Sequence, residues 1–205
     1  AGYLIGGNNV CEGTNSGSLE LSSYEGSIIK WEKSTDGGQN WSDITNNSNK
    51  LYYNNLTDTT HYRVIVNSGG CVPDTSNTQI ISIYPKPVSG FSFDNVCQGL
   101  QTSFNDTSTV SSGIISSYSW NFGSGLGSNI KNPLIILPSS GYHSVLLVVT
   151  SNFGCVDSIR IDTVEVKQNP VADFVFTNVC DGDLMTFFSS STNSDFLVFD
   201  YGDGS

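Results

Sequence analysis

The sequence predicts an all-β chain built of tandem β-sandwiches, and three observations lead to this prediction. First, the phrase Asn-Val-Cys-x-Gly occurs three times, with its cysteine at Cys11, Cys97 and Cys180. The phrase returns at a nearly constant spacing, and a fixed period of this kind marks a row of similar modules. Second, Gly, Ser, Thr and Asn are abundant and only 13% of residues are charged, which favours short strands and many turns. Third, apolar and polar residues alternate in short runs.

The first module, residues 1–85, contains four runs with the pattern of strands. They are Ser18–Leu21, Ser27–Glu32, Tyr62–Val66 and Gln79–Ile83. Trp31 lies in sequence between the two cysteines of this module, Cys11 and Cys71. Short strands with a tryptophan between two widely spaced cysteines are typical of an immunoglobulin-like (Ig-like) sandwich. We therefore expect Trp31 in the core, beside a disulfide.

The second module, residues 86–168, repeats this plan, with Trp120 expected in the core. Its expected strands are Phe91–Phe93, Tyr118–Phe122, Tyr142–Val149 and Ile159–Val166. Prolines at both junctions of this module predict short, stiff linkers. From residue 169 the sequence repeats the second module at a constant offset, with Phe174 in the place of Phe91. We expect residues 169–205 to be the start of a third, truncated module whose missing strands leave one face bare.

The five cysteines predict a disulfide framework. Pairing Cys11 with Cys71 and Cys97 with Cys155 gives each complete module one intramodule disulfide, which stabilises it by about 4 kcal/mol in the chain-entropy model. Cys180 is then unpaired through truncation, because its partner is expected beyond the sequence given. Disulfides persist in oxidising surroundings, so an extracellular location is predicted. A metal site fits less well, because the cysteines occur singly and the sequence has only two histidines, His61 and His143.

Charge and motifs exclude several functional classes. The formal net charge is −11, from 19 acidic and 8 basic residues, and this excess repels nucleic acid and anionic lipid. No run approaches the length of a membrane-spanning helix, so direct membrane insertion is not expected. We find no Gly-x-Ser-x-Gly, His-Glu-x-x-His or phosphate-binding glycine loop. The sequence therefore predicts neither an enzyme nor a bound cofactor.

Three sets of residues allow both a structural and a functional interpretation. Ser34-x-Asp36-x-Gly38-x-x-Trp41 fits the Asp-box of sialidases, but a sialidase site needs several arginines and only Arg63 and Arg160 are present. We interpret it as a hairpin turn in which the aspartate satisfies backbone donors and the tryptophan packs beneath. Four acids that offer oxygen ligands for calcium are interpreted as solvated turn residues: Asp181, Asp183, Asp200 and Asp203. Four aromatics are candidates for stacking on sugar rings, although packing is the commoner role: Tyr24, Trp41, Tyr52 and Tyr53.

Several motifs resemble known families. The runs Tyr118–Gly123, Gly141–Val145 and Tyr201–Gly204, together with Pro138, resemble the Trp-x-Phe-Gly-Asp-Gly and Pro…Gly-x-Tyr-x-Val signatures of PKD domains. Asn121 and Ser124 depart from that pattern, since acids are usual there. The first module resembles the Ig-like repeats of secreted Bacteroidetes proteins, through Val10–Asn15 and Trp31–Trp41.

This resemblance implies modules of very large surface proteins, including adhesins of gliding bacteria exported by the type IX secretion system. It implies a stalk or adhesive filament at the cell surface, attached to the outer membrane, that serves surface attachment or gliding motility. The implied partners are the secretion machinery and an extracellular polysaccharide or other surface ligand. The alternative interpretation is a spacer or glycan-binding accessory region of a secreted polysaccharide-degrading enzyme.

Overall fold

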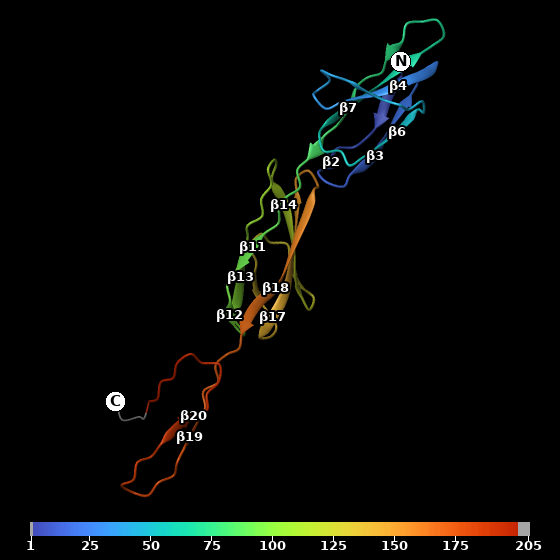
Figure 1. The fold of residues 1–205 in the computed structure, drawn as a ribbon. Helices are drawn as coiled ribbons and strands as arrows, with labels where there is room; N and C mark the ends of the chain where they lie inside the picture. The colour runs from blue at the N-terminus through green and yellow to red at the C-terminus, as the bar shows by residue number, and fades with distance from the viewer. Residues whose placement is uncertain (1, 201–205) are drawn as a thin grey trace. The chain divides into compact units, whose positions relative to one another are not determined.

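The structure is a computed structural model that describes residues 2–200, and its regular elements are all β-strands (Figure 1). None of the residues from 2 to 200 forms a helix long and apolar enough to cross a membrane. The predicted all-β class is confirmed. Seven of the eight predicted strands fall inside single observed strands, and the eighth, Gln79–Ile83, covers β9 and the start of β10.

The first repeat contains ten strands in two facing sheets. One sheet has the order β1-β3-β6, and the other has the order β5-β4-β7-β8 with β9 also paired to β7. A short parallel pair, β2 with β10, lies apart from both sheets. The strands are β1 (Tyr3–Gly6), β2 (Val10–Cys11), β3 (Ser16–Ser22), β4 (Ser27–Ser34), β5 (Ser42–Ile44), β6 (Lys50–Asn54), β7 (Thr60–Asn67), β8 (Asp74–Thr75), β9 (Gln79–Ile81) and β10 (Ile83–Tyr84).

Alternation along the strands builds the core of this first sandwich. Tyr62, Val64 and Val66 of β7 are buried, and the residues between them are half-buried. Trp31 of β4 is fully buried against them, and its indole Nε1 donates to the Ser48 carbonyl at 2.9 Å. This hydrogen bond satisfies the one polar atom of the ring, so Trp31 is a core residue as predicted.

The second repeat is also a two-sheet sandwich. Its sheets have the orders β11-β13-β16 and β12-β18-β17-β14-β15. Trp120 is buried among phenylalanines and lies 5.1 Å from Phe91, ring centroid to ring centroid, while its Nε1 donates to the Ile130 carbonyl at 3.0 Å. The strands are β11 (Phe91–Phe93), β12 (Val96–Cys97), β13 (Gln101–Asp106), β14 (Ile115–Gly123), β15 (Leu126–Ser128), β16 (Leu134–Ile136), β17 (Gly141–Ser151) and β18 (Val156–Lys167).

The chain forms two compact units whose limits differ from those of the repeats. Within the described residues, the first unit comprises 2–89, 108–117 and 148–158, and the second comprises 90–107, 118–147 and 159–200. The first unit thus contains β1 to β10 together with the turn between β17 and β18. That turn carries Cys155.

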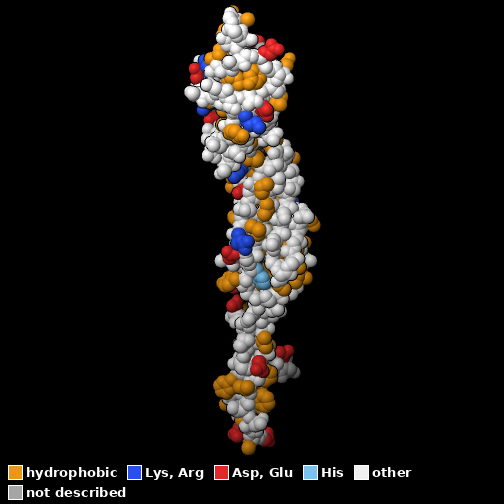
Figure 2. Space-filling model, turned by 90° about the vertical axis from the view of Figure 1, so that its right-hand side faces the viewer, with side chains coloured by type: hydrophobic (Ala, Val, Ile, Leu, Met, Phe, Trp, Pro, Cys, Tyr) orange, Lys and Arg blue, Asp and Glu red, His pale blue; other side chains and the backbone are white. Residues whose placement is uncertain are grey.

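Residues 169–200 repeat the opening of the second sandwich. β19 (Phe174–Phe176) pairs with β20 (Phe187–Ser189) in the register of β11 with β13, so that Phe174 faces Ser189 as Phe91 faces Asp106. The isolated bridge Val171–Thr192 likewise repeats the bridge Val88–Thr109. Large hydrophobic side chains of this segment are open to solvent, including Phe174 at 51% and Phe188 at 56% exposure (Figure 2). The PKD-like motif Tyr201–Gly204 lies outside the described residues.

Candidate functional site: the Cys11–Cys155 bridge

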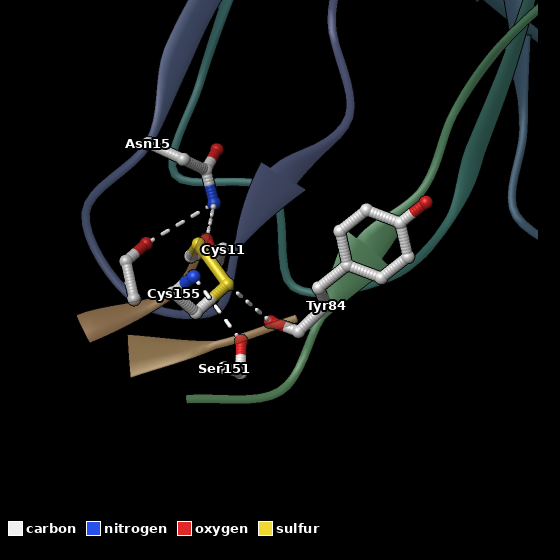
Figure 3. Close-up of a disulfide and its surroundings, with 6 residues drawn as sticks. Cys11, Asn15, Tyr84, Ser151 and Cys155 are labelled. Atoms are coloured by element: carbon white, nitrogen blue, oxygen red, sulfur yellow. Dashed lines mark hydrogen bonds between the residues drawn. A yellow bond between two sulfur atoms is a disulfide. The ribbon is translucent and has the colours of Figure 1, made fainter. Parts of the chain in front are cut away.

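A disulfide joins Cys11 to Cys155 inside the first compact unit (Figure 3). The two Cα atoms are 5.6 Å apart, and the cysteines are 144 residues apart in sequence, so they belong to different repeats. Cys71, Cys97 and Cys180 keep free thiols. The predicted intramodule pairs, Cys11–Cys71 and Cys97–Cys155, are therefore wrong.

The length of β7 explains why Cys11 does not pair with Cys71. Cys11 lies beside Tyr84 in the β2–β10 ladder, and Ile81, shortly before Tyr84, pairs with Thr60 at the start of β7. Cys71 follows the other end of β7. A strand of this length spans roughly 23 Å, whereas the Cα atoms of a disulfide lie within about 7 Å. The two cysteines are thus at opposite ends of their sandwich.

The second predicted pair fails for the same reason. Cys155 immediately precedes β18, and Cys97 pairs with Lys167, the last residue of that strand. A strand as long as β18 extends for roughly 36 Å. Cys11 and Cys97, the cysteines of the repeated phrase, therefore lie where the last strand of a sandwich ends. Cys71 and Cys155, which each follow a glycine, lie in the turns after β7 and β17.

Hydrogen bonds hold Cys11 in place on β2. The Val10 N–H donates to the Ser82 carbonyl at 2.9 Å, and the Glu12 N–H donates to the Tyr84 carbonyl at 2.8 Å. The buried Asn15 amide donates to the Cys11 carbonyl at 3.1 Å (Figure 3), and it also donates to the Leu56 carbonyl at 2.8 Å. Its oxygen accepts from the Leu56 N–H at 2.9 Å. One side chain thus ties the cysteine-bearing turn to the chain between β6 and β7.

Cys155 is held in a tight turn and is fully buried. Its N–H donates to the Ser151 hydroxyl at 3.2 Å (Figure 3), and its carbonyl accepts from the Ser151 N–H at 2.8 Å. Gly154 has a φ of +80°, in the left-handed region that favours glycine. The Cys155 sulfur lies 3.8 Å from the Tyr84 carbonyl oxygen. Because a bridged sulfur carries no proton, we regard this approach as a van der Waals contact.

Two further contacts support the bridge. The rings of Tyr84 and Phe153 stack with centroids 4.1 Å apart and planes 3° from parallel. A carboxylate oxygen of Asp157 accepts from the Ser89 hydroxyl at 2.6 Å and from the Ser89 N–H at 2.8 Å. The hydrogen bond from the Ser89 hydroxyl lowers the pKa of Asp157 most, and the hydrogen bond from the Ser89 N–H lowers it further. On one side of Cys155, Phe153 thus stacks on Tyr84 at the end of the first repeat, and on the other side Asp157 binds Ser89, just after the junction.

The Asp-box forms the predicted hairpin turn. The Asp36 carboxylate accepts from the N–H groups of Gln39 and Asn40 at 3.0 and 2.9 Å, and from the Ser34 hydroxyl at 2.7 Å. The Trp41 indole donates to the Gly38 carbonyl at 2.9 Å. Among these bonds, the backbone bond from Asn40 contributes most to lowering the pKa of Asp36 well below its ordinary value of 3.8.

This lowered pKa predicts an acid-dependent stability difference for Asp36→Asn. The folded state favours the carboxylate, so its contribution is fully present well above pH 3.8 and is lost as the pH falls through the folded-state pKa. Wild type should be more stable than Asp36→Asn at pH 6, and the gap should narrow progressively below about pH 4. Urea unfolding at a series of pH values measures it. Gln39→Ala, which keeps the backbone donor, is the control and should follow wild type; a gap that is constant with pH would contradict the prediction.

The aromatic candidates have different environments. Tyr53 is buried, Tyr24 packs against the core, and Trp41 lies beneath the Arg63 guanidinium, 3.9 Å from ring centroid to Cζ. Arg63 in turn donates to the buried Glu32 carboxylate at 2.6 Å. Of the four, Tyr52 is open to solvent, with 75% of its side chain exposed.

The candidate metal ligands do not gather in the part of the chain that the structure describes. Residues 2–200 contain no group of three or more His, Cys, Asp or Glu side chains arranged to hold a metal ion. Asp181 and Asp183 lie in the turn after Cys180, and Asp203 lies outside the described residues. His61 is on β7 and His143 is on β17.

Comparison with known families identifies the second repeat. Residues 85–166 match the family model described as PKD domain. Residues 1–85 match a model described as a domain of unknown function (DUF8696). The chain is also 32% identical over 112 residues to the pre-pro-metalloprotease PrtV of Vibrio cholerae serotype O1, a match that covers 53% of this chain and 12% of PrtV. The chain thus spans a small part of the length of this relative.

Solved structures with similarity to the chain include isolated PKD domains. The PKD1 domain of the Vibrio cholerae metalloprotease PrtV is 34% identical, with a TM-score of 0.36 over 40% of this chain and 96% of that domain. The PKD1 domain of Vibrio anguillarum Epp is 30% identical, with a TM-score of 0.36 over 40% of this chain and 95% of that domain. Fibronectin(III)-like modules of Clostridium thermocellum CbhA are 13% identical, with a TM-score of 0.41 over 80% of this chain and 94% of theirs.

Proposed function

We propose that this chain is a segment of a secreted cell-surface repeat protein that acts as a stalk or adhesive filament in surface attachment or gliding motility. The observation that carries the proposal is the Cys11–Cys155 bridge, which covalently connects the end of one repeat to a turn of the next. Disulfides persist in oxidising compartments, which supports a location outside the cytoplasm. The PKD domain of residues 85–166 supports a role as an accessory module rather than a catalytic one.

The position of the bridge suits a protein that is pulled at its ends. A force applied before Cys11 and after Cys155 is transmitted through the sulfur–sulfur bond. Residues 12–154, which include Trp31 and Trp120, then lie off the covalent path of the force. A spacer that only separates two domains has no need of this arrangement, whereas a filament anchored at one end and attached at the other does.

An extracellular polysaccharide is the ligand class that the exposed surface supports. Tyr3 on β1 and Tyr52 on β6 are 66% and 75% exposed, on the side of the β1-β3-β6 sheet opposite the buried Leu4 and Leu51. Exposed aromatic rings on a sheet offer apolar faces to sugar rings. Export by the type IX secretion machinery and attachment to the outer membrane complete the proposal.

Labelling of living cells tests the surface role. Antibodies raised against residues 1–168 should stain intact cells of the source bacterium, and the stain should disappear after protease treatment of whole cells. Cells that lack the gene should detach from glass under flow more readily than wild type. Antigen found only in the culture medium, with attachment unchanged in the mutant, would rule out the stalk role.

A second candidate function is supported by the similarity to PrtV, a metalloprotease precursor. On this hypothesis the chain is a spacer or glycan-binding accessory region of a secreted hydrolase, such as a polysaccharide-degrading enzyme. Its antigen would then be recovered from the medium together with hydrolytic activity. Retention of the purified chain on immobilised polysaccharide, lost in Tyr52→Ala, would separate glycan binding from a pure spacer role.

A further inference from the structure

We propose that Cys97 and Cys180 each form the same kind of bridge as Cys11, to the Gly-Cys turn of the sandwich that follows, and that Cys71 receives such a bridge from a sandwich that precedes it. The array is then joined at every junction by one disulfide. This inference concerns the linkage alone and does not depend on whether the array is an adhesin or an accessory region.

The backbone around Cys97 repeats that around Cys11. Cys11 pairs with Tyr84 in a parallel ladder, and Cys97 pairs with Lys167 in a parallel ladder of the same register. The Glu12 N–H donates to the Tyr84 carbonyl at 2.8 Å, and the Gln98 N–H donates to the Lys167 carbonyl at 2.9 Å. Cys97 therefore occupies, at the end of the second sandwich, the place that the bridged Cys11 occupies at the end of the first.

The third copy of the phrase keeps the same turn. The glycine of each copy has a left-handed backbone, with φ values of +97° at Gly13, +89° at Gly99 and +92° at Gly182. The chain therefore makes the same left-handed turn two residues after each of the three cysteines. The carbonyl of Cys97 accepts from the Leu100 N–H, and that of Cys180 accepts from the Asp183 N–H, both at 3.1 Å. The thiols of Cys97 and Cys180 are half-buried and exposed respectively, so both are accessible to a partner.

Cys71 has the position of the other bridge member. It follows a glycine in the turn after β7, as Cys155 follows Gly154 in the turn after β17. The structure shows which partner such a turn takes, because Cys155 is bonded to a phrase cysteine of the preceding repeat. Cys71 is exposed at the end of its sandwich away from Cys11. Each free thiol thus matches one half of the observed bridge.

The chemistry needs one oxidant for each bridge. Two thiols lose two protons and two electrons as the sulfur–sulfur bond forms, and the disulfide of a thiol–disulfide oxidoreductase takes them up and becomes a dithiol. Exchange through a mixed disulfide delivers the bond to the two cysteines that folding has brought together.

This linkage limits how far the array can be stretched. Once every junction is bridged, tension leaves Cys155 along β18 and enters the next bridge at Cys180. The segment 155–180 reaches about 85 Å when fully extended. Much of this segment is already extended, because it contains the whole of β18. Trp31 and Trp120 themselves lie outside this path, whereas β18 contributes the buried Val164 and Val166 to the second sandwich.

Disulfide mapping of the full-length secreted protein tests the proposal. After alkylation of free thiols and proteolysis without reductant, mass spectrometry should find the Cys97 peptide linked to a Gly-Cys peptide from beyond residue 169. The Cys71 peptide should be linked to an upstream peptide with the Val-Cys-x-Gly phrase. A Cys97 that is alkylated, or linked to Cys71 or Cys180, would overturn the proposal, whatever the protein does at the cell surface.

A chain of known sequence gives an independent test. In this tandem chain, residues 1–169 are followed by a second copy of residues 87–168. The second copy supplies another Gly154-Cys155 turn, one repeat beyond Cys97. Cys97 should then bridge to the second copy's Cys155, leaving only Cys71 and the second copy's Cys97 open to alkylation. Cys97→Ser should free that second Cys155 and leave the Cys11–Cys155 bridge intact. If Cys97 of the tandem chain without the Cys97→Ser substitution is alkylated while Cys11 is bridged, the proposal is wrong.

Discussion

When residues 1–205 are pulled from their two ends, the reduced chain will extend about 500 Å further than the oxidised chain, since each residue in the loop contributes about 3.5 Å at full extension. The bridge closes a loop with a sequence separation of 144 between its cysteines. In the oxidised chain the force bypasses this loop. Single-molecule force spectroscopy, with and without a dithiol reductant, measures the difference in contour length.

Matched variants separate the bridge from a general effect of reductant. Cys11→Ala should reach the longer extension without reductant, and it should show the unfolding of both sandwiches. Cys71→Ala changes an exposed free thiol and should behave as wild type. If oxidised wild type unfolds to the same length as Cys11→Ala, the bridge does not form in the folded protein, and the proposed mechanical role loses its basis.

Strands and tryptophan positions could be predicted from the sequence because short-range patterns determine them. The alternation in Tyr62–Val66 places every second side chain on one face, and this face is buried in the structure. The Asp-box could also be predicted, since its bonds run from Asp36 to the nearby Gln39 and Asn40. In both cases the partners lie within one strand or one turn.

The cysteine pairing could not be predicted because spacing does not reveal at which end of a sandwich a cysteine lies. That information is in the ladders that pair Cys11 with Tyr84 and Cys97 with Lys167, residues that are remote from each other in sequence. The role of Asn15 was missed for the same reason, since its partner Leu56 is also remote in sequence. The repeated phrase was a signal for the bridge, but it indicated equivalent positions and not partners.

Loss of the bridge should lower the free energy of unfolding by about 5 kcal/mol, the chain-entropy value for a loop of this length, whose closure restricts the unfolded chain. The loop is long because its two cysteines have a sequence separation of 144. The expected loss is a large part of the roughly 5–15 kcal/mol that stabilises ordinary domains. Urea unfolding of Cys11→Ala without reductant, monitored by tryptophan fluorescence, measures this loss of free energy. Reduced wild type should have the same free energy of unfolding as Cys11→Ala.

A double-mutant cycle shows whether the loss comes from the bridge or from packing. Cys155 is fully buried, so Cys155→Ala also removes sulfur contacts, whereas Cys11 is only partly buried. If the bridge dominates, the double variant Cys11→Ala/Cys155→Ala will be little less stable than either single variant, because the first substitution already breaks the bond. Additive losses would instead assign the effect to packing. Cys71→Ala should change the free energy of unfolding by less than about 0.5 kcal/mol, as expected for an exposed side chain.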